Sequence, residues 1–155
     1  MKHIISAVTL MSVFALITVV TGWQESSNEK LPTLLRQESP YSLTETISNI
    51  KHAVKSRNFR MIREQKVAEG FLPGGDKQQH IVYFCNFTDA YQSLQQDKKI
   101  GYMLPCRFTI SEEDGNVMIS ALNPAAVKKL AGAKVGAACD ASGEGFLGIM
   151  EEAVL

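Results

Sequence analysis

The chain has 155 residues, and its 16 basic and 16 acidic side chains leave a net charge of zero at pH 7. This length accommodates one domain and an appendage. A neutral chain is not drawn to nucleic acid or to anionic lipid by its overall field, so we expect no nucleic-acid partner.

Residues 1–22 have the pattern of a secretory signal peptide or an N-terminal membrane anchor. Lys2 and His3 precede an apolar or small run over residues 4–20, which is a positive n-region followed by an h-region. The run is also close to the shortest length that spans a membrane. Cleavage and retention as an inner-membrane tether therefore both stay open. Either way we expect a periplasmic or otherwise exported protein that meets the membrane only through this segment.

The next two regions differ sharply in composition. Residues 23–40 are rich in Ser, Glu, Gln, Asn and Pro, which predicts a polar tether. Residues 41–155 follow as a single domain. Ser42 and Glu45 form the two ends of a capping box. Apolar residues at helical spacing come after it, and they predict a helix that ends near Asn58.

Four segments of the domain are predicted to be strands. Residues 59–65 and 80–85 are rich in β-prone side chains. The second is nearly all apolar, so we expect a central strand buried on both faces. Residues 102–111 and 117–122 flank an Asp-Gly pair at 114–115, which is typical of a tight hairpin turn.

Helices are predicted between and after these strands. Asn86 or Thr88 caps a short helix with Phe87 and Tyr91 on its apolar side. The chain closes with a helix over about residues 145–153. Runs of strands interrupted by helices indicate an α+β fold, with helices packed on one antiparallel sheet.

Three cysteines, Cys85, Cys106 and Cys139, follow the N-terminal segment. In an oxidising compartment an odd number leaves at least one thiol free or paired with another chain. Cys85 precedes a helix N-terminus, whose unpaired amides are expected to lower its thiol pKa. Cys106 falls on the apolar side of its strand. Two interpretations stay open for the pair: buried packing or a Cys85–Cys106 disulfide, and a redox-active or ligand-binding site.

The cysteine spacing argues against a bound metal or haem. There is no Cys-x-x-Cys pair and no Cys-x-x-Cys-His motif, which zinc ribbons and attached haem require. Ligand softness alone would let Cys85, Cys106 and Met103 hold copper(I). We expect no metal site, and the cofactor, if there is one, is unknown.

One stretch of the domain is strongly basic. It is opposed only by Glu64 and has two interpretations: a solvated surface, or a face that binds an anion or a partner. Its members are Lys51, Lys55, Arg57, Arg60, Arg63 and Lys66.

Several short motifs carry a family resemblance. They are Val82-Tyr83-Phe84-Cys85-Asn86-Phe87, Leu104-Pro105-Cys106-Arg107, Asp114-Gly115, Asn123-Pro124 and Glu151-Glu152-Ala153. On these motifs residues 41–155 resemble the bacterial and archaeal family known as domain of unknown function 302. The resemblance implies an α+β fold of the β-α-β4-α type, similar to TATA-binding-protein-like folds, and a homodimer. It implies no activity, because none is established for the family.

The two most specific motifs supply the candidate site residues: Cys85, Asn86, Cys106 and Arg107. No general base is evident, which favours a non-enzymatic periplasmic module that binds a small ligand or a partner near these residues. Two alternatives stay open. One is a thiol-based redox or electron-transfer protein that uses Cys85 and Cys106, and the other is a structural dimer of the envelope.

Overall fold

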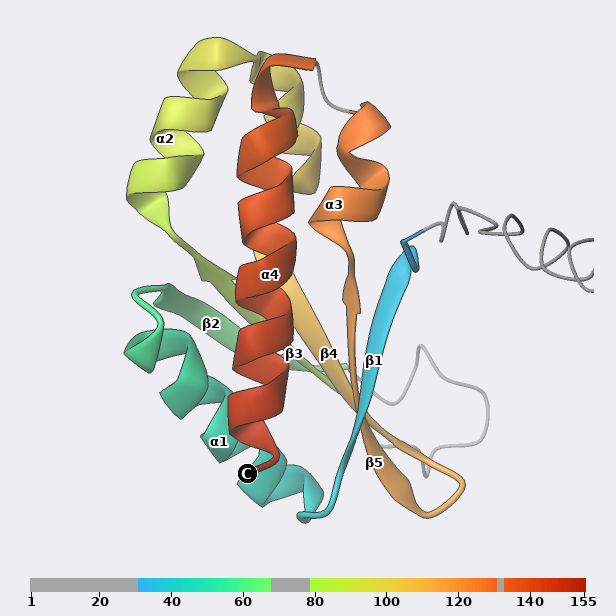
Figure 1. The fold of residues 1–155 in the computed structure, drawn as a ribbon. Helices are drawn as coiled ribbons and strands as arrows, with labels where there is room; N and C mark the ends of the chain where they lie inside the picture. Colours follow the sequence, from blue (N-terminus) through green and yellow to red (C-terminus); the bar gives the residue numbers. More distant parts are fainter. Residues whose placement is uncertain (1–30, 68–78, 131–132) are drawn as a thin grey trace, which may run out of the picture.

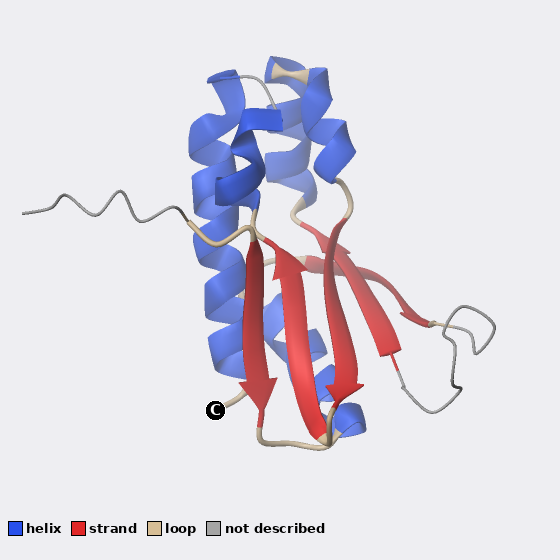
Figure 2. Ribbon diagram, turned by 90° about the vertical axis from the view of Figure 1, so that its right-hand side faces the viewer, coloured by secondary structure: helices blue, strands red, loops and turns tan. Residues whose placement is uncertain are grey.

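The computed structural model describes residues 31–67, 79–130 and 133–155. A five-stranded antiparallel sheet, in the order β1-β5-β4-β3-β2, carries helices on one face (Figures 1 and 2). The strands are β1 (Leu34–Ser39), β2 (Arg60–Lys66), β3 (Gln79–Cys85), β4 (Cys106–Glu113) and β5 (Asn116–Leu122). The helices are α1 (Leu43–Ser56), α2 (Phe87–Gln96), α3 (Pro124–Val127) and α4 (Gly136–Ala153), with 3₁₀ helices η2 (Lys98–Met103), η3 (Lys128–Leu130) and η4 (Ala133–Val135). The predicted fold class is confirmed.

Local signals place α1 and the hairpin as the sequence predicts. The Ser42 hydroxyl accepts from the Glu45 amide at 3.3 Å, so it caps α1. Asn58 follows the helix with φ 62°, a left-handed conformation that asparagine tolerates. Asp114 and Gly115 have φ 52° and 88°, as a tight turn between two antiparallel strands requires.

The N-terminal edge of the sheet differs from the prediction of a tether over residues 23–40. Leu34–Ser39 form β1, which pairs along its whole length with β5. Burial alternates along β1, which explains how a polar segment joins the core: Leu35 and Ser39 are buried, whereas Leu34 and Arg36 are exposed. The pattern is short and mostly polar, so composition alone hides it.

The prediction that β3 is a central strand buried on both faces is wrong. β4 is central, and β3 lies second from the edge. Val82 and Phe84 are fully buried under the helices. Ile81 and Tyr83, on the opposite face, are only half-buried. Figure 2 shows that this second face of the sheet, here called the open face, carries no helix among the described residues.

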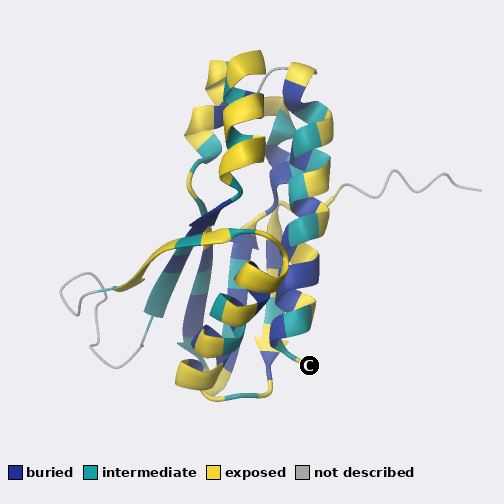
Figure 3. Cartoon of the chain, turned by 90° about the vertical axis from the view of Figure 1, so that its left-hand side faces the viewer, coloured by how far each residue is buried: buried dark blue, intermediate teal, exposed yellow. Residues whose placement is uncertain are grey.

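The helices depart from prediction at two places. Phe87 and Tyr91 were expected to face the core, but they are 52% and 65% exposed on α2, whose outer side faces solvent in Figure 3. Helix α4 begins at Gly136, nine residues before the predicted start at 145. The N-terminal part of α4 needs a glycine at position 143, because a Cβ there would lie 3.0 Å from Oδ1 of Asn123.

Aromatic packing forms the centre of the core. Phe84 stacks on Phe108 with ring centroids 4.7 Å apart, and Phe146 of α4 leans on both. Phe59, which precedes β2, meets Phe84 edge-on at 5.5 Å. Such pairs add to the free energy of area burial, so this cluster holds α4 against the sheet.

The helices divide into two groups along the length of the molecule. α1 and the C-terminal half of α4 cover the sheet, and α1 packs against α4 (Figure 1). The other helices and the start of α4 lie beyond the end of the sheet where β3 ends and β4 begins. We call this part the helical cap. Within the described residues no helix is long and apolar enough to cross a membrane, and the predicted signal or anchor over 1–22 lies outside them.

Candidate functional site

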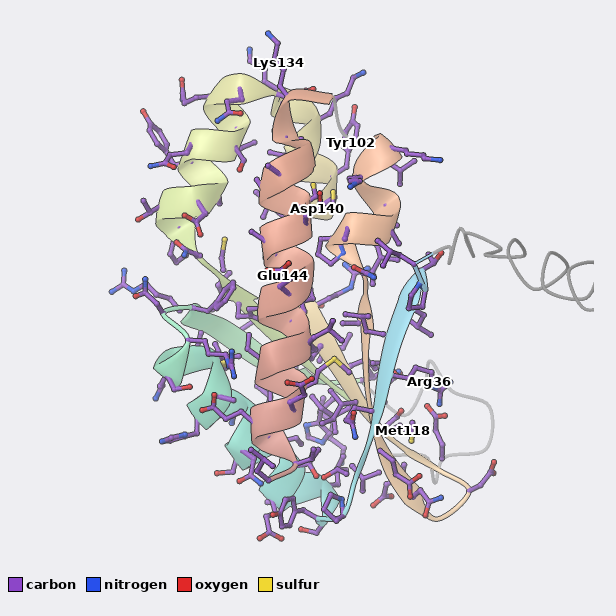
Figure 4. All side chains as sticks on the ribbon, viewed as in Figure 1. Arg36, Tyr102, Met118, Lys134, Asp140 and Glu144 are labelled. Atoms are coloured by element: carbon purple, nitrogen blue, oxygen red, sulfur yellow. The ribbon has the colours of Figure 1, made fainter. Side chains whose placement is uncertain are left out.

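A cavity of about 350 Å³ lies where the helical cap meets the end of the sheet. Its wall is mainly apolar, with polar groups contributed by α2 and by the strand ends. The lining residues used below are Phe59, Cys85, Asn86, Asp89, Ser93, Ile100, Tyr102, Met103, Cys106, Arg107, Ala138, Cys139 and Phe146. In Figure 4, Tyr102 marks the cap end of the molecule, far from Arg36 and Met118 on the sheet.

The end of β3 supplies the first two predicted site residues. Cys85 is its last residue and is buried. Asn86 then caps α2, because its Oδ1 accepts from the amides of Thr88 and Asp89 at 3.2 and 3.3 Å. Asparagine is a preferred residue at this position, so the local sequence turns the chain from the strand into the cap directly beside the cavity.

The start of β4 supplies the other two. Cys106 is opposite Phe84 in the register and shares its face of the sheet. Arg107 is opposite Tyr83 and therefore belongs to the open face. The structure thus brings all four sequence-predicted residues to one cavity, although they come from separate strand ends.

Helix α4 contributes groups that the sequence interpretation did not assign to the site. Cys139, 2% exposed, packs in a second apolar cluster with Ile100 and Val135. Ser93 of α2 also lines the cavity and is 7% exposed. The buried positions Cys139, Gly143 and Phe146 do recur at helical spacing. Four glycines in α4 obscure this signal, since glycine lowers helix propensity.

All three thiols are protonated at neutral pH, because the pKa of each is raised above its ordinary value. Burial raises the pKa of Cys106 to about 12, with a further contribution from Cys85. Burial and then the Asp89 carboxylate raise the pKa of Cys85, and burial and then Asp140 raise that of Cys139. The prediction of a lowered Cys85 pKa is wrong, because desolvation and an adjacent carboxylate outweigh the helix N-terminus.

The thiols are also unpaired. All three cysteines are free in this structure, so the predicted disulfide between Cys85 and Cys106 is not formed here and stays a prediction for oxidised protein. Within the described part of the chain, no three His, Cys, Asp or Glu side chains are arranged to hold a metal ion. The cavity therefore offers three neutral thiols in a mainly apolar wall.

Alkylation of the native protein at neutral pH is expected to be slow at every cysteine. Because the thiolate is the reactive form and burial raises the pKa of Cys106 to about 12, its labelling should still accelerate above pH 9.0, where an ordinary thiol levels off. Iodoacetamide labelling across pH, read by peptide mass spectrometry with a urea-unfolded control, measures this. Rapid labelling of Cys85 at neutral pH would contradict it and favour the redox alternative.

The basic residues between 51 and 66 make different contacts: some pair with carboxylates, and another lies over an aromatic ring. Lys51 and His80 both contact the Glu64 carboxylate, the His80 Nδ1 to Oε1 distance being 2.9 Å. The hydrogen bond from Lys51, followed by that from His80, lowers the pKa of Glu64 against the effect of its desolvation. Arg63 instead lies over the ring of Tyr83, with 4.6 Å from Cζ to the ring centroid. Part of the stretch is thus neutralised, and part lies on the open face.

The fold and the cavity together define a small α+β domain in which a helical cap covers one end of an antiparallel sheet. A family model described as Domain of unknown function DUF302 matches residues 35–152. The chain belongs to this family, as the sequence motifs predicted.

A solved structure supports the same fold. The crystal structure of an uncharacterized conserved DUF302 protein from Bacillus stearothermophilus is similar, with a TM-score of 0.68 and 18% sequence identity. The match covers 78% of this chain and 98% of that one. At this identity the likeness shows the fold alone. No curated protein matches the chain.

Proposed function

We propose that this protein is an exported, non-enzymatic module that binds a small molecule in the cavity beneath the helical cap. The cavity itself carries the proposal. Its volume of about 350 Å³ is within the range of small-molecule sites, which are mostly apolar and hold a few polar groups. Export is supported by the apolar run over residues 4–20 of the sequence.

The side chains of the cavity favour binding over catalysis. Its titratable groups are Asp89, Tyr102, Arg107 and the three thiols, and no histidine is among the lining residues that the structure describes. The thiols are protonated at neutral pH, since burial raises the pKa of each. A nucleophilic mechanism would need an adjacent base or a lowered pKa. The carboxylate beside Cys85, Asp89, raises its pKa, and no hydrogen bond joins a thiol to a base among the described residues.

A thiol-based redox function is the second candidate. It is favoured by one observation, that Cys85, Cys106 and Cys139 all line the same cavity. The raised pKa values oppose it, because thiol–disulfide exchange begins with attack by a thiolate. The labelling experiment above separates the two candidates.

Filling the cavity tests the binding function. Ala138 lines the cavity, whereas its neighbour Ala137 on α4 is exposed and does not. We expect Ala138→Phe to abolish ligand retention and Ala137→Phe to preserve it, since only the first side chain occupies the ligand volume. Native mass spectrometry of each full-length protein, purified from the envelope of its own host, measures the retained mass.

The matched substitutions control for folding, because both add the same side chain to the same helix. Thermal unfolding by circular dichroism should give similar midpoints for the two variants. A wild-type protein that carries no extra mass, or an Ala138→Phe variant that keeps it, would overturn the proposed function.

A further inference from the structure

A row of two arginines and a tyrosine crosses the open face beside the cavity. Arg63 on β2 is opposite Tyr83 on β3, and Tyr83 is opposite Arg107 on β4. Residues opposite one another project from the same face of a sheet, on strands about 4.8 Å apart. The ring of Tyr83 is already occupied by the Arg63 guanidinium, so two positive groups flank one aromatic side chain.

The charge of this row is not neutralised by the described parts of the chain. Each ion pair found there involves other basic groups, namely Arg36, Lys51, Arg57, His80 and Lys128. An arginine without a carboxylate partner presents several donors in a planar fork, which suits a carboxylate or phosphate. The row therefore fits an anion.

Arg107 links this anion-binding row to the cavity, because it also lines the cavity wall. Asp89 also lines the cavity and lies close enough to Cys85 to raise its pKa, so the wall around this carboxylate is unsuited to an anion. Much of the rest of the wall is formed by apolar and sulfur side chains such as Phe146, Ile100 and Met103. The site thus combines the cationic Arg107 with a mainly apolar wall that also holds the Asp89 carboxylate and a few polar side chains.

We propose that the ligand is an amphiphilic anion, with an apolar chain in the cap cavity and a carboxylate or phosphate group on Arg107 at the edge of the Arg63–Tyr83–Arg107 row. This inference rests on the proposed function and adds the ligand class. It also gives a role to part of the basic stretch singled out in the sequence.

Three probes of equal chain length test the ligand class: octanoate, octyl phosphate and octanol. The full-length protein is held in nanodiscs of zwitterionic lipid, and binding of the radiolabelled probes is measured by equilibrium dialysis against empty nanodiscs. At least one anion should bind about 10-fold or more tightly than octanol, as a charge-assisted hydrogen bond predicts. The stronger of the two anions distinguishes a carboxylate from a phosphate ligand.

Two arginine variants locate the anionic group. Arg107→Gln should reduce the affinity for the anion about 10-fold or more and leave that for octanol unchanged. Arg36→Gln is the matched control. Arg36 projects from the same face as Arg107, but it lies on the edge strand β1, away from the row, and pairs with Glu113 (Figure 4). This control should leave all three affinities unchanged.

The possible failures are distinguishable. If octanol binds as tightly as both anions, or if Arg107→Gln acts no differently from Arg36→Gln, the ligand class is wrong and the cavity remains a binding site. Anion binding that survives Ala138→Phe would place the ligand outside the cavity and overturn both proposals. If no probe binds the wild-type protein, the ligand class is overturned, and retention of a host molecule decides the proposed function separately.

Discussion

Replacing Phe84 with alanine is expected to lower the free energy of unfolding by about 3–5 kcal/mol. Phe84 is fully buried, and its ring meets those of Phe59, Phe108 and Phe146. Truncation removes the transfer free energy of the ring and leaves a cavity. The rigid, interlocked neighbours have little freedom to close that space. Urea unfolding followed by circular dichroism measures the loss.

Phe87→Ala is the matched control for this prediction. Phe87 lies three residues further on, at the start of α2, and is 52% exposed. The same substitution should therefore cost about 1 kcal/mol or less. Equal losses for the two variants would contradict the placement of Phe84 at the centre of the core.

Replacing Asn123 with leucine is expected to cost about 3 kcal/mol. Asn123 is 4% exposed, and its side chain makes two hydrogen bonds. Oδ1 accepts from the Ala125 amide at 3.0 Å, which caps α3, and Nδ2 donates to the Pro32 carbonyl at 2.9 Å, which fixes the chain entering β1. Leucine leaves both backbone groups without their partner, and Gly143 of α4 lies too close for any rearrangement.

Asn123→Ser separates the two contributions. Serine is also a preferred helix cap, so it keeps the bond to the Ala125 amide and loses only the bond to Pro32. An intermediate loss of about 1–2 kcal/mol is expected from urea unfolding. A loss below about 1 kcal/mol for the leucine variant would show that neither bond matters.

Much of the fold could be predicted because its signals are local. Ser42 caps α1, Asn86 caps α2, and the Asp-Gly pair at 114–115 turns the hairpin. The two caps satisfy backbone amides only a few residues away, and the Asp-Gly pair adopts the positive φ angles of the turn, so neighbouring residues contain each signal. The family assignment follows from motifs of the same short range.

Predictions that depended on long-range packing were the ones that failed. β3 is as apolar as a central strand, but β1 pairs with β5 at the other edge of the sheet, so that β4 is the central strand. Phe87 and Tyr91 are apolar and exposed, since nothing covers the outer side of α2 in the described structure. Cys85 precedes a helix start, but burial sets its pKa.

The sequence by itself determined the α+β class and the family, and it named Cys85, Asn86, Cys106 and Arg107 as candidate site residues. Tertiary structure alone decided that these residues share one cavity with Cys139, and that Arg107 also joins a row with Arg63. The physical reason is that a cavity and a cross-strand row are formed by residues far apart in the chain. Their positions follow from strand register and helix packing, which local sequence does not encode.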